Sequence, residues 1–102
     1  MSAINNIKIG VKNFSIQHPM EIVEVGGEYA GTCDFREETI KIADKLTQHD
    51  KNQTFLHEII HAICQRFMMQ GLNQDEQTID LLATGLYEVI KDNPHIFLME
   101  DI

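Results

Sequence analysis

Two histidines and a glutamate in the second half of the chain have the spacing of a metal site. The segment reads Thr-Phe-Leu-His57-Glu58-Ile-Ile-His61. On a helix, residues four apart lie about 40° apart around the axis and one turn apart in height, so both imidazoles can bind one metal ion. Glu58 lies about 100° from His57, where its carboxylate can reach a water molecule on the open side of the ion. The segment therefore predicts two metal ligands and one general base on a single helical turn.

A zinc ion in a hydrolytic site takes three protein ligands, so a third ligand must lie elsewhere in the chain. Cys64 lies about 60° from His61, toward the apolar stripe of the same helix, which is typical of a small buried thiol. Cys33 is a weaker candidate still. Glu76 and Asp80 are four residues apart on one face of the next predicted helix. One of these carboxylates can bind the metal while the other accepts a hydrogen bond from a ligating histidine.

The spacing leaves the choice between these two carboxylates open. If the two helices form an antiparallel hairpin that turns at Gly71, Asp80 lies level with His61 and is the favoured ligand. A steep crossing angle, or an early end of the first helix, brings Glu76 to the site instead. Asn73 is the predicted N-cap of this helix. Without a metal, Glu76 would complete a capping box with Asn73, and Asp80 would be a solvated surface charge.

These residues together resemble a known family. His57-Glu58-x-x-His61 followed by Glu76-x-x-x-Asp80 is similar to the gluzincin branch of the zincin metallopeptidases. The wider segment from Thr54 to Pro94 resembles small zincin-like proteins of phage and prophage genomes, distant relatives of the ImmA/IrrE-type peptidases.

The resemblance implies a cofactor, a set of site residues and a place for substrate. One Zn²⁺ per chain would be bound by His57, His61 and Glu76. Glu58 would be the catalytic general base, and Asp80 would be the partner of a ligating histidine. Substrate would lie extended along the strand over residues 39–43, at its exposed edge.

Two helices are predicted to position the site residues. Apolar residues recur at three- and four-residue spacing over 52–70, and Gly71 is expected to end that helix. A second helix over 74–92 is expected to end just before Pro94, because the residue before a proline is disfavoured in helical conformation. Residues 95–102 form a short apolar and acidic tail with no predicted element.

Residues 1–45 are predicted to supply a sheet. Ile7, Ile9 and Val11 alternate with polar residues or glycine, and three further apolar runs follow, separated by turns at 26–27 and 36–38. The expected fold class is α+β: a small N-terminal antiparallel or mixed sheet packed on two helices, forming one minimal zincin-like domain over residues 1–102.

Composition limits the partners and the compartment. A chain of 102 residues suits one domain, and a net charge of −8 without any cluster of Lys or Arg argues against nucleic acid and anionic membranes. No apolar run approaches the roughly 20 residues of a membrane span, and the start has no secretory signal pattern, so a cytoplasmic protein is expected. Cys33 and Cys64 are then expected to be free thiols.

Two functions fit these observations. The first is a zinc-dependent metallopeptidase that hydrolyses an intracellular protein or peptide. The alternative is a non-catalytic zinc-binding domain, structural or regulatory, of a phage or mobile-element protein. The chain is too short to hold a further subdomain with an oxyanion donor, so any donor must come from a loop or helix. Candidates are Tyr29, Arg36, His49, Tyr87 and His95.

Overall fold

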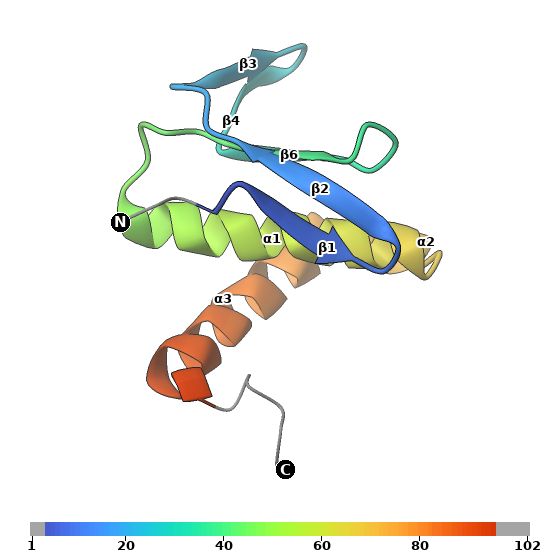
Figure 1. Ribbon diagram of the computed structural model, residues 1–102, viewed down its shortest axis with the longest axis vertical. Coiled ribbons are helices and arrows are strands. Elements are labelled where there is room, and N and C mark those ends of the chain that lie inside the picture. The colour runs from blue at the N-terminus through green and yellow to red at the C-terminus, as the bar shows by residue number, and fades with distance from the viewer. Residues whose placement is uncertain (1–3, 96–102) are drawn as a thin grey trace.

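The chain folds into a small sheet with helices against it, and the predicted α+β class is confirmed. Figure 1 shows the computed structural model, which describes residues 4–95. The strands are β1 (Asn6–Ile9), β2 (Lys12–Gln17), β3 (Ile22–Glu24), β4 (Gly27–Tyr29), β5 (Gly31–Asp34) and β6 (Thr39–Ile42). The helices are α1 (Gln48–Arg66), α2 (Gln70–Asn73) and α3 (Glu76–Asp92). Residues 96–102 of the predicted tail lie outside the described residues.

Four strands form one mixed sheet in the order β1-β2-β6-β5, and β3 and β4 form a separate hairpin. β2 and β6 are parallel, whereas the β1–β2 and β5–β6 pairs are antiparallel. The first predicted strand is shorter than expected because Gly10, at φ +64°, turns the chain after Ile9. Val11 is consequently in the turn, 92% exposed, and not in a half-buried strand as predicted.

The predicted location of a free sheet edge was wrong. β6 lies between β2 and β5 and is paired on both sides, so residues 39–43 offer no open edge to a peptide. The strand at this side of the sheet is β5, which pairs only with β6 among the described strands. β5 also packs against α1, and Figure 1 shows this helix running across one face of the sheet.

The main core lies between the sheet and α1. In β2 the alternation of buried and exposed residues places Phe14 and Ile16 on the face toward the helix. Ile40 and Ile42 of β6 are buried on the same face. This core consists of Ile9, Phe14, Ile16, Ile40, Ile42 and Ala62.

A second, smaller core joins α1 to α3. It consists of Ile60, Cys64, Ile79 and Ala83, with Leu56 and Leu72 packed at its border. α3 crosses beneath α1 and diverges from it toward its C-terminal end (Figure 1). The apolar stripe predicted for this helix is therefore only partly covered: Ile79 and Ala83 are buried, while Leu82, Leu86 and Val89 are 41–45% exposed.

The helix boundaries differ from the predicted ones at both ends of α1. The helix begins at Gln48, where the side chain of Thr47 accepts a hydrogen bond from the Asp50 backbone N–H, and not at residue 52. It ends at Arg66, because Met68 takes a positive φ of 58° and breaks the helical path. Gly71 lies within α2 and does not end the first helix, contrary to the prediction.

The N-cap predicted for the second helix was also wrong. Asp75, not Asn73, accepts the hydrogen bond of the Thr78 backbone N–H at the start of α3. The predicted capping box between Asn73 and Glu76 is therefore absent, and both side chains are available for other contacts. The predicted end is confirmed, since the helix stops at Asp92 ahead of Pro94.

Two further expectations can be compared with the described residues. Cys33 and Cys64 are both free thiols, as expected. None of the helices over residues 4–95 combines the length and the apolar character that crossing a membrane requires.

Candidate metal centre

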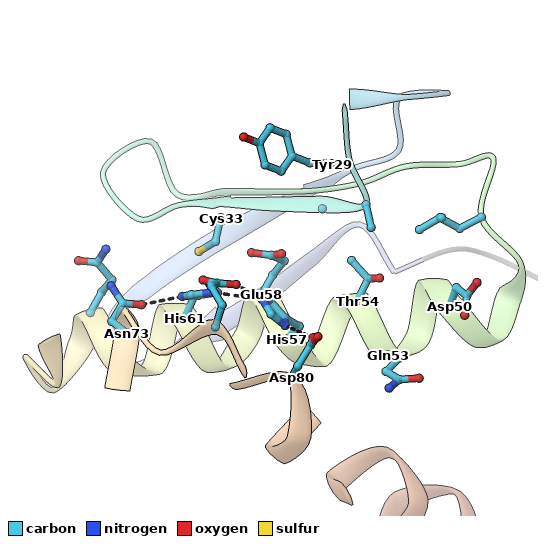
Figure 2. A pocket seen from close by; sticks show the side chains of 15 residues that line it. Tyr29, Cys33, Asp50, Gln53, Thr54, His57, Glu58, His61, Asn73 and Asp80 are labelled. Atoms are coloured by element: carbon cyan, nitrogen blue, oxygen red, sulfur yellow. Dashed lines mark hydrogen bonds and ion pairs between the residues drawn. The ribbon is translucent and has the colours of Figure 1, made fainter. Parts of the chain in front are cut away.

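His57 and His61 project from consecutive turns of α1 into a cleft between this helix, the β4–β5 segment and the start of α3 (Figure 2). Their Nε2 atoms are 3.2 Å apart, and their ring centroids are 4.9 Å apart. Both side chains are about five-sixths buried, at 15% and 16% exposure. α1 presents both rings to the cleft because Ile60 and Ala62, which flank the histidines on either side of the helix, are buried in the two cores.

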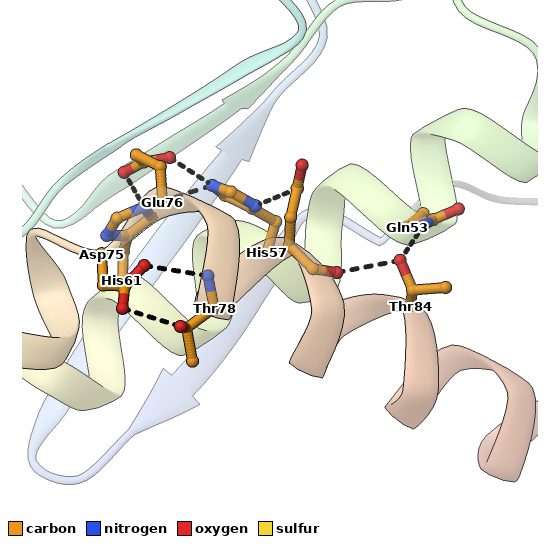
Figure 3. Close-up of polar contacts among 8 residues, drawn as sticks. Gln53, His57, His61, Asp75, Glu76, Thr78 and Thr84 are labelled. Carbon is orange, nitrogen blue, oxygen red and sulfur yellow. Dashed lines mark hydrogen bonds and ion pairs between the residues drawn. The ribbon is translucent and has the colours of Figure 1, made fainter.

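The Glu76 carboxylate faces both histidines from the first turn of α3 (Figure 3). Its Oε2 is 3.0 Å from His57 Nε2, and its Oε1 is 2.8 Å from His61 Nε2. In a tetrahedral zinc site with bonds of about 2.0–2.1 Å, neighbouring ligand atoms are roughly 3.3 Å apart. The three separations in this site, from 2.8 to 3.2 Å, lie close to that value. Two imidazole nitrogens and one carboxylate oxygen also form a ligand set that Zn²⁺ prefers, so these residues fit the ion.

Each histidine has a hydrogen-bond acceptor behind it. His57 Nδ1 lies 2.8 Å from Asp80 Oδ1, and His61 Nδ1 lies 2.7 Å from Asn73 Oδ1. With both Nδ1 atoms donating to these oxygens, the Nε2 lone pair of each ring is directed toward Glu76 and its partner ring. The side chains of Glu76 and Asp80 therefore occupy opposite sides of the His57 ring.

The arrangement of the helices explains why Glu76 and not Asp80 lies at the Nε2 atoms. The hairpin that would have favoured Asp80 is not formed, because α1 ends at Arg66 and α2 intervenes before α3. α3 then crosses α1 obliquely (Figure 1), and the Glu76 carboxylate in its first turn reaches both rings. Gln53 and Asn52 of α1 fix this crossing through side-chain hydrogen bonds to Thr84 and Tyr87 of α3.

Asn73 is the site residue that the sequence prediction missed. Its position three residues before Glu76 predicts an N-cap, and this role gives no indication of a contact with His61. A signal was present, because Asp75 with Thr78 three residues later is an equally good cap and leaves Asn73 unassigned.

Glu58 is the one buried charged residue among those described, at 6% exposure. No side-chain oxygen in the described chain is both fully buried and without a hydrogen-bond partner, and the Glu58 carboxylate borders the same cleft as the histidines. Burial raises its pKa from the ordinary 4.5 to about 7, although the nearby His57 and His61 act in the opposite direction. Such a group can accept a proton near neutral pH, as the predicted general base must.

The cleft has a volume of about 800 Å³ and an acidic lining. Glu58, Glu76, Asp80 and Asp50 supply carboxylates, and neither Lys nor Arg is among its described lining residues. Cys33 borders it from β5, and burial together with the neighbouring Glu58 raises the pKa of this thiol to about 12. The thiol is therefore neutral at ordinary pH.

The remaining candidate residues lie elsewhere, with one exception. Cys64 is buried in the core between α1 and α3, as expected for a packing thiol. His49 and Tyr87 contact each other, with ring centroids 5.1 Å apart, and do not line the cleft. Arg36 lines a second surface hollow on β5 and β6. Of the candidate oxyanion donors only Tyr29 borders the cleft, and its hydroxyl donates to Val25 O at 3.3 Å.

The family is shown by a match over most of the chain. A family model described as the SprT-like family matches residues 11–77. This chain belongs to the SprT-like family. SprT-like domains are related to zincin-like metallopeptidases, so the coarse zincin-like resemblance is confirmed. The segment matched to the SprT-like family contains His57, Glu58, His61 and Glu76 and ends before Asp80. Searches of curated proteins and of solved structures returned no match to this SprT-like chain.

Proposed function

We propose that this protein is a zinc-dependent peptidase. The observation that carries the proposal is the combination of a three-residue group that could hold a metal with a largely buried carboxylate, Glu58, bordering the same cleft. The relationship of SprT-like domains to metallopeptidases supports it. The finer resemblance to ImmA/IrrE-type peptidases of phages remains a prediction.

In this proposal, His57, His61 and Glu76 hold one Zn²⁺. Asp80 and Asn73 keep the two imidazoles in the tautomer and orientation that the ion requires, through their contacts at Nδ1. Zinc bound by such a set supplies an activated water and a Lewis acid for a peptide carbonyl.

Glu58 then acts as the general base and afterwards as the general acid. Its carboxylate takes a proton from the attacking water and later donates it to the nitrogen of the leaving amine. The buried position supports this role, because a carboxylate with a pKa of about 7 can both accept and release a proton near neutral pH.

The geometry of β5 supports a place for an extended peptide. Ala43 N–H donates to Ala30 O, and these two residues, one position beyond the ends of β6 and β5, continue the register of the two strands as a hydrogen-bonded pair. In an antiparallel ladder such pairs alternate with non-bonded ones, which include Gly31 opposite Ile42 and Cys33 opposite Ile40. The backbone N–H and C=O groups of Gly31 and Cys33 are therefore directed away from β6. We infer that a protein or peptide substrate pairs with this edge as an added strand, above the histidines.

The second candidate function is a zinc-binding domain without catalysis. It is favoured by one observation: Tyr29, the one candidate oxyanion donor bordering the cleft in the described chain, has its hydroxyl bonded to Val25 O. A peptidase needs a donor where negative charge develops on the substrate carbonyl. The two functions share the metal and differ in the consequence of removing Glu58.

The test uses the whole chain loaded with Zn²⁺ and a proteome-derived peptide library, with new peptide ends read by mass spectrometry. The parent protein should hold about one zinc per chain and generate new ends, and Glu58→Gln should keep the zinc and generate none. Glu88→Gln is the matched control, since Glu88 is exposed on α3 away from the cleft. Equal cleavage by Glu58→Gln, or no cleavage by the zinc-loaded parent, would overturn the peptidase proposal.

A further inference from the structure

Gly31 lies where β5 passes closest to Glu58. A Cβ built on this glycine would be 3.2 Å from Glu58 Oε2, 3.0 Å from the backbone oxygen of Lys41 and 2.6 Å from the Thr54 methyl carbon. Carbon atoms in contact are normally about 3.5–4.0 Å apart, so the methyl group would be too close by about 1 Å. The missing side chain is therefore the reason that β5 and α1 can approach each other here.

The backbone does not require a glycine at this position. The φ angle of Gly31 lies outside the left-handed region, unlike those of Gly10, Gly26 and Gly27. A glycine inside a strand also weakens the strand, because it supplies no side chain for packing and loses more conformational entropy on folding. Glycine is needed at residue 31 because no side chain fits in the space beside the cleft.

The groups around the space at residue 31 determine which of them would move if a side chain were added there. The Lys41 oxygen belongs to the backbone of β6, in the interior of the sheet, and is fixed by the β5–β6 ladder. Thr54 and Glu58 are side chains of α1, one helical turn apart. A side chain at residue 31 would therefore displace these two residues rather than the strand.

We propose that Gly31 is a positioning residue for the reaction: by carrying no side chain, it keeps the Glu58 carboxylate at its place between β5 and the two histidines. The inference rests on the proposed peptidase function for its kinetic consequence. The three nearest neighbours of a Cβ built at Gly31 belong to Thr54, Lys41 and Glu58 and not to His57, His61 or Glu76, so filling that space acts first on the base and not on the metal-binding residues. Filling it should impair catalysis while zinc binding is retained.

The first measurement concerns the geometry alone. In the zinc-loaded parent protein, NMR should show a strong nuclear Overhauser effect between the Gly31 Hα protons and the Thr54 methyl group. This measurement does not depend on cleavage, so its failure is distinguishable from a failure of the peptidase proposal. Absence of the signal would overturn the proposed packing even if the protein proves to be a peptidase.

The second measurement separates positioning from stability. Gly31→Ala should lower kcat on the best-cleaved library peptide by about 10- to 100-fold, because a displacement of about 1 Å in a catalytic group has effects of this size. The zinc dissociation constant and the absorption spectrum of the Co²⁺-substituted protein should be unchanged. Gly85→Ala is the matched control, since nothing lies within 4 Å of a Cβ built there, and its kcat should equal that of the parent.

A compensating variant completes the test. Thr54→Ser removes the methyl group that makes the closest contact, so Gly31→Ala/Thr54→Ser should recover most of the lost kcat. Unchanged kcat in Gly31→Ala would overturn the proposal. So would a parallel loss of zinc affinity and kcat, or a double variant no better than the single one, because each would indicate a general packing role.

Discussion

The raised pKa of Glu58 predicts a specific pH dependence of stability in the metal-free protein. In the unfolded chain this carboxyl group ionises at its ordinary pKa of 4.5, whereas the folded protein holds the proton up to about pH 7. Between these values the folded state binds more protons than the unfolded state, so the free energy of unfolding falls as the pH rises. At about 1.4 kcal/mol per pKa unit, the full difference corresponds to about 3.5 kcal/mol.

Replacing Glu58 by Gln removes this ionisation. Glu58→Gln should therefore be more stable than the parent by an amount that grows by about 2–3 kcal/mol between pH 5 and pH 8. The assay is urea unfolding of the chelator-treated proteins at a series of pH values, with Glu88→Gln as control. Zn²⁺ should reduce the difference at pH 8, because a nearby cation favours the ionised carboxylate. If the stability difference between Glu58→Gln and the parent is the same at pH 5 and pH 8, burial does not control the pKa of Glu58 and the reasoning is refuted.

Three further outcomes are expected. Asn73→Ala should weaken zinc binding by about 10- to 100-fold in a chelator competition, because His61 loses its acceptor at Nδ1; an unchanged affinity would contradict the role given to this contact. Asp75→Ala should lower the free energy of unfolding by about 1 kcal/mol through loss of the α3 cap, measured by circular dichroism melting. A loss of this size in Asn73→Ala and none in Asp75→Ala would show that Asn73 is the cap instead. Phe14→Ala should destabilise the protein by about 3–5 kcal/mol in urea unfolding, whereas Val11→Ala, in the exposed turn, should change it by less than about 0.5 kcal/mol.

Local patterns in the sequence predicted the elements better than their ends. The alternation of apolar residues and the three- and four-residue spacing are repeated over many positions, so strands and helices could be recognised from them. Gly71 was expected to end α1, but the chain turns earlier at Met68, a residue type that rarely takes a positive φ. Met68 is 80% exposed, and the turn is held by backbone hydrogen bonds such as Met69 N–H to Cys64 O, which form with any residue type and therefore leave no sequence signature.

At the site, the residues on one helix could be predicted and those on different helices could not be ranked. His57, Glu58 and His61 lie within one turn of α1, where helix geometry alone fixes their relation. The choice between Glu76 and Asp80 depended on how α3 crosses α1, which is set by contacts such as Gln53–Thr84 between distant parts of the chain. For the same reason the free edge was assigned to residues 39–43, because strand order is a property of the whole sheet.

Glu76, the third residue of the candidate metal centre, comes from α3, and this has a thermodynamic consequence. α3 is held to α1 by a small core around Ile79 and by a few polar contacts. Zn²⁺ bound by His57, His61 and Glu76 would bridge the two helices, so binding of the ion and docking of α3 become linked equilibria. Any change that loosens α3, even one distant from the ion such as Ile79→Ala, would weaken zinc binding, and zinc would in turn hold α3 in place. The affinity for the ion is thus a measure of how firmly the helix is docked.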